Sequence, residues 1–420
     1  MFVGWFTEQP MSVYPEQEAR LEGGLTVLTF SNRHFDPDAA SQLYAQHLAQ
    51  YRLVDEVGFD GIVTNEHHNS PFGMQSQALV WPSVLAAITH RAKIVPLGVP
   101  LPLHDNPLQV AESLAMIDMI SGGRLVAGVV RGGGTEQYAM NANPAYNRAR
   151  FEEAHDLLIK TWTTPGPFRW EGDHYQFRVV NPWAMPMQQP HPRIWVPGTS
   201  SNETIEWAAR HRYPYIGRLT GAGVRPRLDA LYGATARALG YEAGPECFGE
   251  LVSVIAQDTE AHALQNAEQF DWMTAGISGL AHPVWSTPAG FLHSARRMTG
   301  VLRANGRVDP PGMRGGRGAR RTHRTREQFQ DDGIIAGTPA QVIDALRARF
   351  PQSRPGIFIV NGSEGRMSHA DTMRSIELLG TQVLPALREI AGELGLRSPD
   401  EAGAPVSLAY PPSVPSVPPA

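Results

Sequence analysis

The stretch NPLQVAESLAMIDMISGGRLVAGVVRGGG, residues 106–134, decides the fold because a helix, a stop and a strand follow one another in it. Asn106 and Pro107 are typical of a helix start, with an N-cap side chain followed by a first-turn proline. Apolar residues recur at helical spacing until the sequence Ser-Gly-Gly at 121–123 ends the helix. The run from Arg124 to Val130 then predicts a strand, so this stretch indicates an alternation of helices and strands.

The same alternation continues on both sides of this stretch, as repeated βα units require. Eight strands are predicted, and this number in a chain of 420 residues favours an α/β fold closed into a (β/α)₈ TIM barrel with inserted loops. An open doubly wound sheet is the alternative, but no Gly-x-Gly-x-x-Gly sequence follows the first strand. The predicted strands are Phe2–Phe6, Gly61–Asn65, Lys93–Val99, Arg124–Val130, Arg193–Val196, Tyr213–Ile216, Glu250–Ala256 and Gly356–Val360.

Residues 1–400 are interpreted as a single barrel domain, with insertions at about 163–192 and 280–330. The first insertion contains a predicted hairpin, Phe168 to Phe177, that turns at Gly172-Asp173. In the second, arginines among glycines at 313–326 favour a mobile surface loop over a lid for an anionic cofactor. The Pro-rich residues 401–420 are predicted to be a disordered tail. The predicted helices are 37–57, 77–89, 107–120, 148–162, 202–211, 225–239, 339–350 and 370–390.

The composition is that of a soluble globular protein, with 42% apolar and 18% charged residues. A formal net charge of −5 offers no general attraction for phosphate backbones, so nucleic acid is not an expected partner. We expect neither a secretion signal nor a membrane anchor, because no basic start and no spanning apolar run are present. Cys247 has no disulfide partner within the chain, which favours a reducing compartment and a cytoplasmic location.

A histidine pair follows the second predicted strand, at the end of a barrel where function gathers. Neighbouring residues of an extended chain point to opposite faces, so only one of His67 and His68 is expected to face the barrel mouth. A neutral imidazole there can hydrogen-bond a peroxide or accept a substrate proton. The competing interpretation is a structural histidine bonded to backbone. Zinc is disfavoured, because no His-Glu-x-x-His or paired-cysteine spacing supplies further ligands, and no metal is expected.

Two loops after neighbouring strands have the character of phosphate sites. Arg131 precedes three glycines, whose backbone amides can approach a phosphate closely while the arginine binds it bidentately. After the fifth strand, Ser200 and Ser201 lead into a helix that contains Thr204, which places hydroxyls and amides at a helix N-terminus. An ordinary N-cap by Ser201 is the alternative. Adjacent strands would bring both loops to one rim, which predicts a phosphate-bearing cofactor.

The aromatic and Met-rich segment 183–187 is either part of an apolar pocket or simply packed in the core or a loop, and packing is the favoured interpretation.

Five segments resemble, in order and spacing, the bacterial luciferase-like flavin-dependent monooxygenases, and together they span nearly the whole chain. They are Glu56–His68, Asn106–Arg124, the Arg131-Gly132 turn, Ser200–Trp207 and Gly337-Thr338-Pro339. The resemblance implies the family's barrel with a bound reduced flavin mononucleotide (FMN).

By this resemblance, His67 corresponds to the luciferase catalytic histidine, which assists the flavin hydroperoxide, and His68 is its neighbour. The resemblance also implies a non-proline cis peptide at Gly98-Val99, beneath the isoalloxazine ring. Two departures argue against light emission from a long-chain aldehyde: Val130 replaces a cysteine of the luciferase catalytic subunits, and Ser200 replaces an acidic residue. The residues implied to hold the flavin phosphate are Arg131, Ser200, Ser201 and Thr204.

The resemblance further implies a two-component reaction. A separate flavin reductase supplies reduced FMN, which reacts with O₂ to oxygenate a small organic substrate by hydroxylation or Baeyer–Villiger-type insertion. Two alternatives stay open: a deazaflavin-dependent oxidoreductase that transfers hydride without oxygen, and a non-catalytic flavin-binding subunit. Analogy with the family suggests a homodimer.

Overall fold

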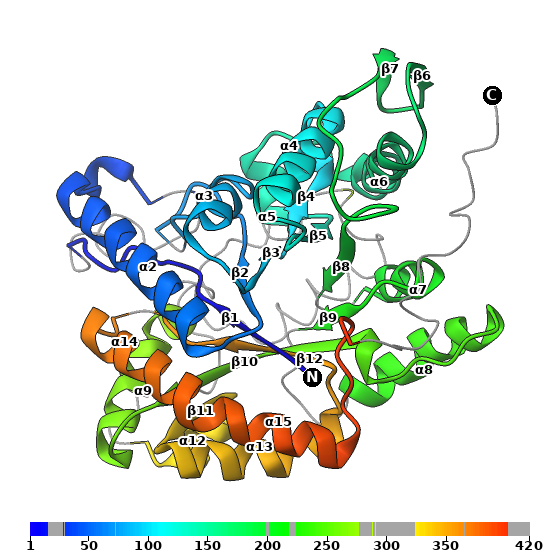
Figure 1. Cartoon of the computed structure of the whole chain (residues 1–420). Coiled ribbons are helices and arrows are strands. Elements are labelled where there is room, and N and C mark those ends of the chain that lie inside the picture. Colours follow the sequence, from blue (N-terminus) through cyan, green and yellow to red (C-terminus); the bar gives the residue numbers. More distant parts are fainter. Residues whose placement is uncertain are drawn as a thin grey trace, which may run out of the picture.

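The computed structural model (Figure 1) describes residues 1–15, 28, 30–71, 73–198, 201–217, 224–276, 288, 290, 324–364 and 366–401. Every structural statement below concerns these residues, and the side chains at 224–225 and 271–276 are left aside. Ser200, most of the predicted insertion at 280–330 and the predicted tail beyond Glu401 lie outside the described residues.

A ring of eight parallel strand positions forms the centre of the described chain, and the predicted barrel is confirmed. The ring is closed by a parallel bridge between Ile94 and Leu125, where the Ile94 N–H donates to the Arg124 carbonyl at 2.9 Å. In ring order the strands are β1 (Phe2–Phe6), β2 (Gly61–Thr64), β3 (Lys93–Pro96) continued by β4 (Val99–Pro100), β5 (Val126–Val130), β8 (Arg193–Gly198), β9 (Tyr215–Gly217), β10 (Phe248–Ala256) and β12 (Ile357–Asn361).

The predicted third strand is divided in the structure, because β3 pairs with β2 whereas β4 pairs with β5. A non-proline cis peptide lies between the two parts and joins Leu97 to Gly98, so the predicted position at Gly98-Val99 is wrong by one residue. The reason is local: the Leu97 N–H still donates to the Thr64 carbonyl at 2.7 Å, so pairing with β2 ends only after Leu97. A Cβ on Gly98 would lie 3.1 Å from the Gly128 carbonyl, so the two strands approach closely there.

One strand was not predicted. β11 (Ile334–Gly337) pairs in parallel with residues 253–256 of β10 and lies outside the ring. It packs with α9 and α12 around a small apolar cluster that is separate from the main core. We call this group the α9–β11 cluster; it consists of Ile255, Ala263, Ala267, Phe270, Phe329, Ile334 and Ala336.

Helices lie on the outer side of the strands (Figure 1), and several start where the sequence predicts. Asp36 accepts hydrogen bonds from the N–H groups of the first turn of α2, and Asn106 does the same for α4. The helices α5, α9 and α12 were not predicted, and the predicted helix 370–390 is divided by a π-helical turn at Leu379–Val383. The described helices are α2 (Pro37–Val57), α3 (Val80–Ile88), α4 (Pro107–Ile120), α5 (Gly134–Ala139), α6 (Asn147–Thr163), α7 (Asn202–Arg210), α8 (Val224–Ala238), α9 (Glu260–Gly276), α12 (Arg326–Asp331), α13 (Pro339–Ser353), α14 (His369–Leu378) and α15 (Leu384–Leu394), with 3-10 turns at 32–34, 101–103, 144–146 and 245–247.

The barrel interior is filled by side chains from alternating strand positions, so it is a packed core and not a pore. Phe2 and Trp195 meet edge to face there, with ring centroids 5.0 Å apart. Each large apolar side chain buried in this way stabilises the fold by about 1.5–3 kcal/mol. A second, larger core lies between the strands and the helices.

The predicted hairpin in the first insertion is present as β6 (Phe168–Glu171) and β7 (Gln176–Val180). Further along this insertion, the side chains of Trp183 and Met187 are 93% and 57% exposed, so they neither pack in the core nor line the cavity described below. At the end of the predicted Arg-rich loop, α12 begins at Arg326 with Thr325 as its cap, so the last residue of that segment is helical. In the described part of the chain, no helix is both long and apolar enough to cross a membrane.

Candidate active site

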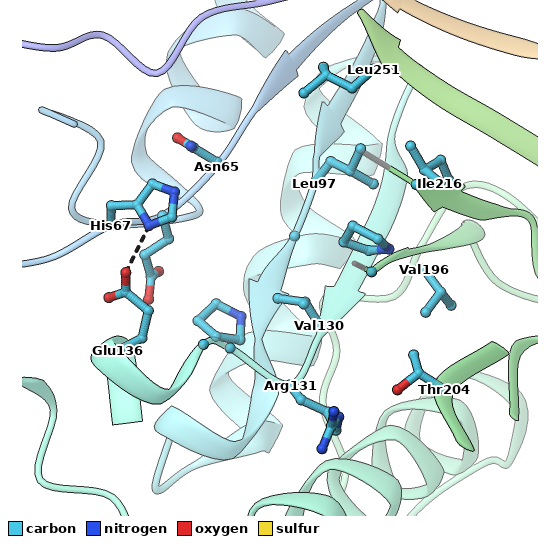
Figure 2. A pocket seen from close by; sticks show the side chains of 18 of the residues that line it. Asn65, His67, Leu97, Val130, Arg131, Glu136, Val196, Thr204, Ile216 and Leu251 are labelled. Carbon is cyan, nitrogen blue, oxygen red and sulfur yellow. Dashed lines mark hydrogen bonds and ion pairs between the residues drawn. The ribbon is translucent and has the colours of Figure 1, made fainter. Parts of the chain in front are cut away.

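A cavity of about 510 Å³ opens at the carboxyl ends of the barrel strands (Figure 2). Its middle is apolar, and its two ends are polar: His67 and Glu136 lie on one side of the view, and Arg131 and Thr204 on the other. The apolar wall comes from neighbouring strands and consists of Phe6, Val63, Leu97, Val130, Val196, Ile216 and Leu251.

Arg131 directly follows β5 and is fixed at its end of the cavity by Asn147. The guanidinium donates to the Asn147 side-chain oxygen at 3.3 Å, while the Asn147 amide donates to the Arg131 carbonyl at 2.8 Å. Burial, together with the like charge of Arg148, lowers the pKa of Arg131 to about 10, although Glu203 and Glu152 act to raise it. Arg131 is half-buried and lies near a second positive charge, so a bound anion would stabilise this pair of arginines.

Ser201 and Thr204, at the start of α7, line the same cavity as Arg131, as predicted for residues that follow two adjacent strands. Arg148 on α6 donates to the hydroxyls of Thr204, at 3.2 Å, and Ser201, at 3.5 Å. Ser201 stands at the N-cap position but does not cap the helix with its side chain, because its hydroxyl donates to Glu203 instead, at 2.7 Å. The first turn of α7 therefore has no side-chain cap, and its N–H groups can bind an anion.

His67 lines the other end of the cavity with both ring nitrogens held by carboxylates. Its Nδ1 lies 2.8 Å from Glu136 Oε1, and its Nε2 lies 3.2 Å from Glu8 Oε2. Burial lowers the pKa of His67, but the charge of Glu8 and the hydrogen bond to Glu136 outweigh burial and raise this pKa to about 10. The ring is therefore protonated near neutral pH, whereas the sequence pattern predicts a neutral imidazole.

His68 is not brought to the cavity. Its side chain is only 7% exposed, and its Nε2 lies 2.9 Å from Glu66 Oε1. The hydrogen bond to Glu66 raises the pKa of His68 against the opposing effect of burial. The expectation that one histidine of the pair faces the mouth is confirmed for His67, and His68 is not among the described residues that line the cavity.

Of the remaining predicted residues, one lines the cavity and one does not. Gly98 lines the cavity, whereas Val99 is fully buried in the core between strands and helices. Ser200 lies outside the described residues.

Three charged residues of the site were missed by the sequence analysis: Glu8, Glu136 and Arg148. Glu8 follows β1, so the rule that function gathers after barrel strands could have found it. Glu136 lies on α5, an unpredicted helix that begins inside the glycine run. Arg148 lies in the first turn of α6, and no local pattern marks it as different from a surface arginine.

Two buried acceptors at the His67 end have no hydrogen-bond donor among the described residues: the Asn65 side-chain oxygen and Glu136 Oε2. Both residues line the cavity. The Asn65 amide donates to Glu8, whereas its oxygen accepts no hydrogen bond from the described residues. A buried acceptor without a donor costs free energy, so both atoms favour a ligand that brings N–H or O–H groups.

Together the fold and the site define a TIM barrel whose cavity has an arginine at one end, an apolar middle and a charged histidine at the other end. The chain belongs to the luciferase-like monooxygenase family, because the family model matches residues 25–353.

Individual relatives agree with this assignment. The chain is 30% identical over 175 residues to the oxygenase component of a flavin-dependent trigonelline monooxygenase from Acinetobacter baylyi, an alignment that covers 40% of this chain and 46% of that one. It thus spans about half the length of the curated relatives that it matches first. A longer alignment joins it to an FMNH₂-dependent dimethylsulfone monooxygenase from Pseudomonas putida, with 26% identity over 385 residues, 89% of this chain and 94% of that one.

Solved structures show the same fold. One is the oxygenating constituent of 3,6-diketocamphane monooxygenase from Pseudomonas putida, a type II Baeyer–Villiger enzyme in complex with FMN, with a TM-score of 0.62 at 18% identity over 86% of this chain and 97% of that one. Another is an F420-dependent secondary alcohol dehydrogenase, with a TM-score of 0.60 at 15% identity over 92% of this chain and 99% of that one. The fold alone therefore does not choose between the two cofactors.

Proposed function

We propose that the protein is the oxygenase of a two-component system, which uses reduced FMN and O₂ to oxygenate a small organic substrate. The observation that supports this most is a single cavity with Arg131 and Thr204 at one end and His67 at the other, joined by apolar walls. A separate flavin reductase would supply the reduced cofactor. The transfer is hydroxylation or insertion of oxygen beside a carbonyl group.

The residues present fit a flavin mononucleotide. Arg131, Arg148, Ser201 and Thr204 offer charge and hydroxyls to a phosphate, and the uncapped first turn of α7 adds backbone N–H groups. The apolar wall fits a flat aromatic ring, and the unsatisfied Asn65 and Glu136 oxygens fit donors at the far end. When bound, reduced FMN supplies the electrons that activate O₂, so that one oxygen atom enters the substrate and the other leaves as water.

The position of each side chain in the cavity indicates its role. Arg131 and Arg148 hold and orient the phosphate, and the apolar wall excludes water from the reacting centre. His67 is the catalytic residue that we assign. The protonated ring carries one N–H on Nδ1, bonded to Glu136, and one on Nε2, bonded to Glu8. When one of these N–H groups exchanges its carboxylate for an oxygen of the reacting groups, it can stabilise a developing negative charge there or deliver its proton, and the carboxylate left behind can accept a replacement proton.

The experiment that tests this proposal is a binding titration with reduced FMN under nitrogen, followed by exposure to O₂. We expect saturable binding, then oxygenation of one class among ketones, aldehydes and aromatic compounds. Tight binding of reduced F420 with no affinity for reduced FMN would favour the deazaflavin alternative. A non-catalytic flavin-binding subunit would bind FMN but form no product from any substrate class. Its O₂ consumption would be the same with and without substrate.

A further inference from the structure

A second cluster of ligand-type side chains lies away from the cavity, between α6 and the end of α7. It consists of His155 and Asp156 on α6 and of His211, the C-terminal cap residue of α7. One ligand atom from each residue can be chosen so that all three lie within 4.8 Å of one another. His155 is buried, whereas the Asp156 side chain is 40% exposed and opens the cluster to solvent. Two imidazoles and a carboxylate are a donor set that Zn²⁺ prefers.

The second nitrogen of each histidine is already bonded to an oxygen, as metal-ligating histidines require. His211 Nδ1 donates to the Trp207 carbonyl at 2.9 Å, which leaves Nε2 for a metal ion. His155 Nε2 lies 2.9 Å from the Tyr213 hydroxyl, and its Nδ1 lies 3.1 Å from an Asp156 oxygen. A cation at Nδ1 of His155 places the ring proton on Nε2, which then donates to Tyr213.

We propose that His155, Asp156 and His211 bind one Zn²⁺ ion, with water in the fourth position. The ion would clamp α6 to α7. These two helices also meet at Arg148 and Thr204, and His155 and His211 follow those residues at the same spacing of about two helical turns along each helix. The clamp therefore holds the pair of helices that forms the anion end of the cavity.

A metal-free explanation makes different predictions. The rings of Trp207 and Tyr213 surround both histidines, with the Trp207 and His211 centroids 4.3 Å apart, so neutral imidazoles can pack there without a cation. In that case the cluster has no affinity for Zn²⁺.

The test uses the full-length protein, freed of metal by dialysis against a chelator and then titrated with Zn²⁺ in competition with a chromophoric chelator. We expect one site per chain. Asp156→Asn and His211→Gln should each weaken it by at least about tenfold, whereas His90→Ala, at an exposed histidine outside the cluster, should leave it unchanged. As a second measurement, added Zn²⁺ should raise the unfolding temperature of the wild-type chain and not that of Asp156→Asn.

A His67→Ala variant tests whether Zn²⁺ binds in the cavity instead, at His67 and the carboxylates beside it. The proposal is overturned if Zn²⁺ binding is lost in His67→Ala and kept in both cluster variants. It is equally overturned if the wild-type chain binds no Zn²⁺ at micromolar concentration. If His211→Gln does not fold, Asp156→Asn decides, because that carboxylate is partly exposed and its loss leaves the buried packing intact.

Discussion

The Arg148 guanidinium donates a hydrogen bond to the Thr204 hydroxyl across 3.2 Å and thereby joins α6 to the first turn of α7. If this pair binds the phosphate of FMN, Arg148→Met should raise the dissociation constant of FMN by about 10- to 100-fold, since a charge-assisted hydrogen bond contributes about 1.5–3 kcal/mol. Thr204→Val should raise the constant by about 3- to 10-fold. Fluorescence titration with FMN measures both changes.

Riboflavin, which lacks the phosphate, is the control ligand for these two variants. Its affinity should stay the same in Arg148→Met. Arg169→Met is the matched control variant, because that side chain is 67% exposed on the β6–β7 hairpin. Equal losses for riboflavin and FMN would mean that Arg148 stabilises the fold and does not touch the phosphate.

His67→Ala removes the charged ring from the cavity. We expect turnover of the oxygenated substrate to fall by about 10²- to 10⁴-fold, the usual contribution of a general acid or base. The affinity for reduced FMN should change far less, because the phosphate is held at the other end of the cavity. Steady-state product formation and flavin titration on the same preparation separate the two effects, and unchanged turnover would exclude the assigned role.

Glu136→Gln should lower the pKa of His67, because the variant keeps a hydrogen-bond acceptor at this position and loses the negative charge that favours the protonated ring. The wild-type pKa is about 10, so an activity that needs the protonated ring should fall only in strongly alkaline solution, and at lower pH in the variant. Histidine Cε1 proton shifts followed against pH, with His67→Ala for assignment, measure the pKa directly.

Glu66→Gln is the matched control for this experiment. Glu66 bonds His68, so its loss should shift the titration of His68 and leave that of His67 in place. A His67 pKa that is the same in Glu136→Gln and in the wild-type chain would contradict the geometry.

Acid should destabilise the protein through two buried neutral histidines. Burial lowers the pKa of His47 and of His191 to about 4, from an ordinary value of 6.5. Between these values the unfolded chain binds more protons than the folded chain, so their contribution to stability is present above pH 6.5 and is lost as the pH falls toward 4. Urea unfolding at a series of pH values should show this slope, and His191→Gln should flatten it.

Gly128 lies where the backbones of two barrel strands approach each other closely. An added Cβ would lie 2.1 Å from the Pro96 carbonyl oxygen and 2.8 Å from Leu97 Cα, so Gly128→Ala should destabilise the fold by more than about 3 kcal/mol.

Gly392 is an exposed residue within α15 that has no neighbour within 4 Å of an added Cβ. Gly392→Ala should therefore stabilise the protein by up to about 1 kcal/mol, as measured by chemical denaturation.

Much of the barrel was predictable because each strand is a short apolar run with a clear stop on each side. Phe2–Phe6 and the helix Pro37–Val57 were predicted with their observed bounds. The division of β3 from β4 was not predictable, because it depends on which neighbour each half pairs with and not on local composition. β11 was missed for a related reason: four residues that add to the end of β10 resemble any short apolar run.

The candidate site was predictable where a residue and its loop have an unusual composition, as for Arg131 before its glycines and for His67 after β2. The two carboxylates that hold His67 come from the segment after β1 and from α5, which are far apart in the sequence. Their combined effect, a protonated ring, arises only when folding brings them to the same imidazole. Local sequence therefore indicates which histidine to test, and tertiary structure determines its charge.

The α9–β11 cluster secures the chain on both sides of the stretch between Phe270 and Phe329 and does so outside the main core. The chain that enters this stretch and the chain that leaves it are therefore held to each other by one small group of apolar side chains, so the loss of Phe270 or Phe329 would loosen both ends at once.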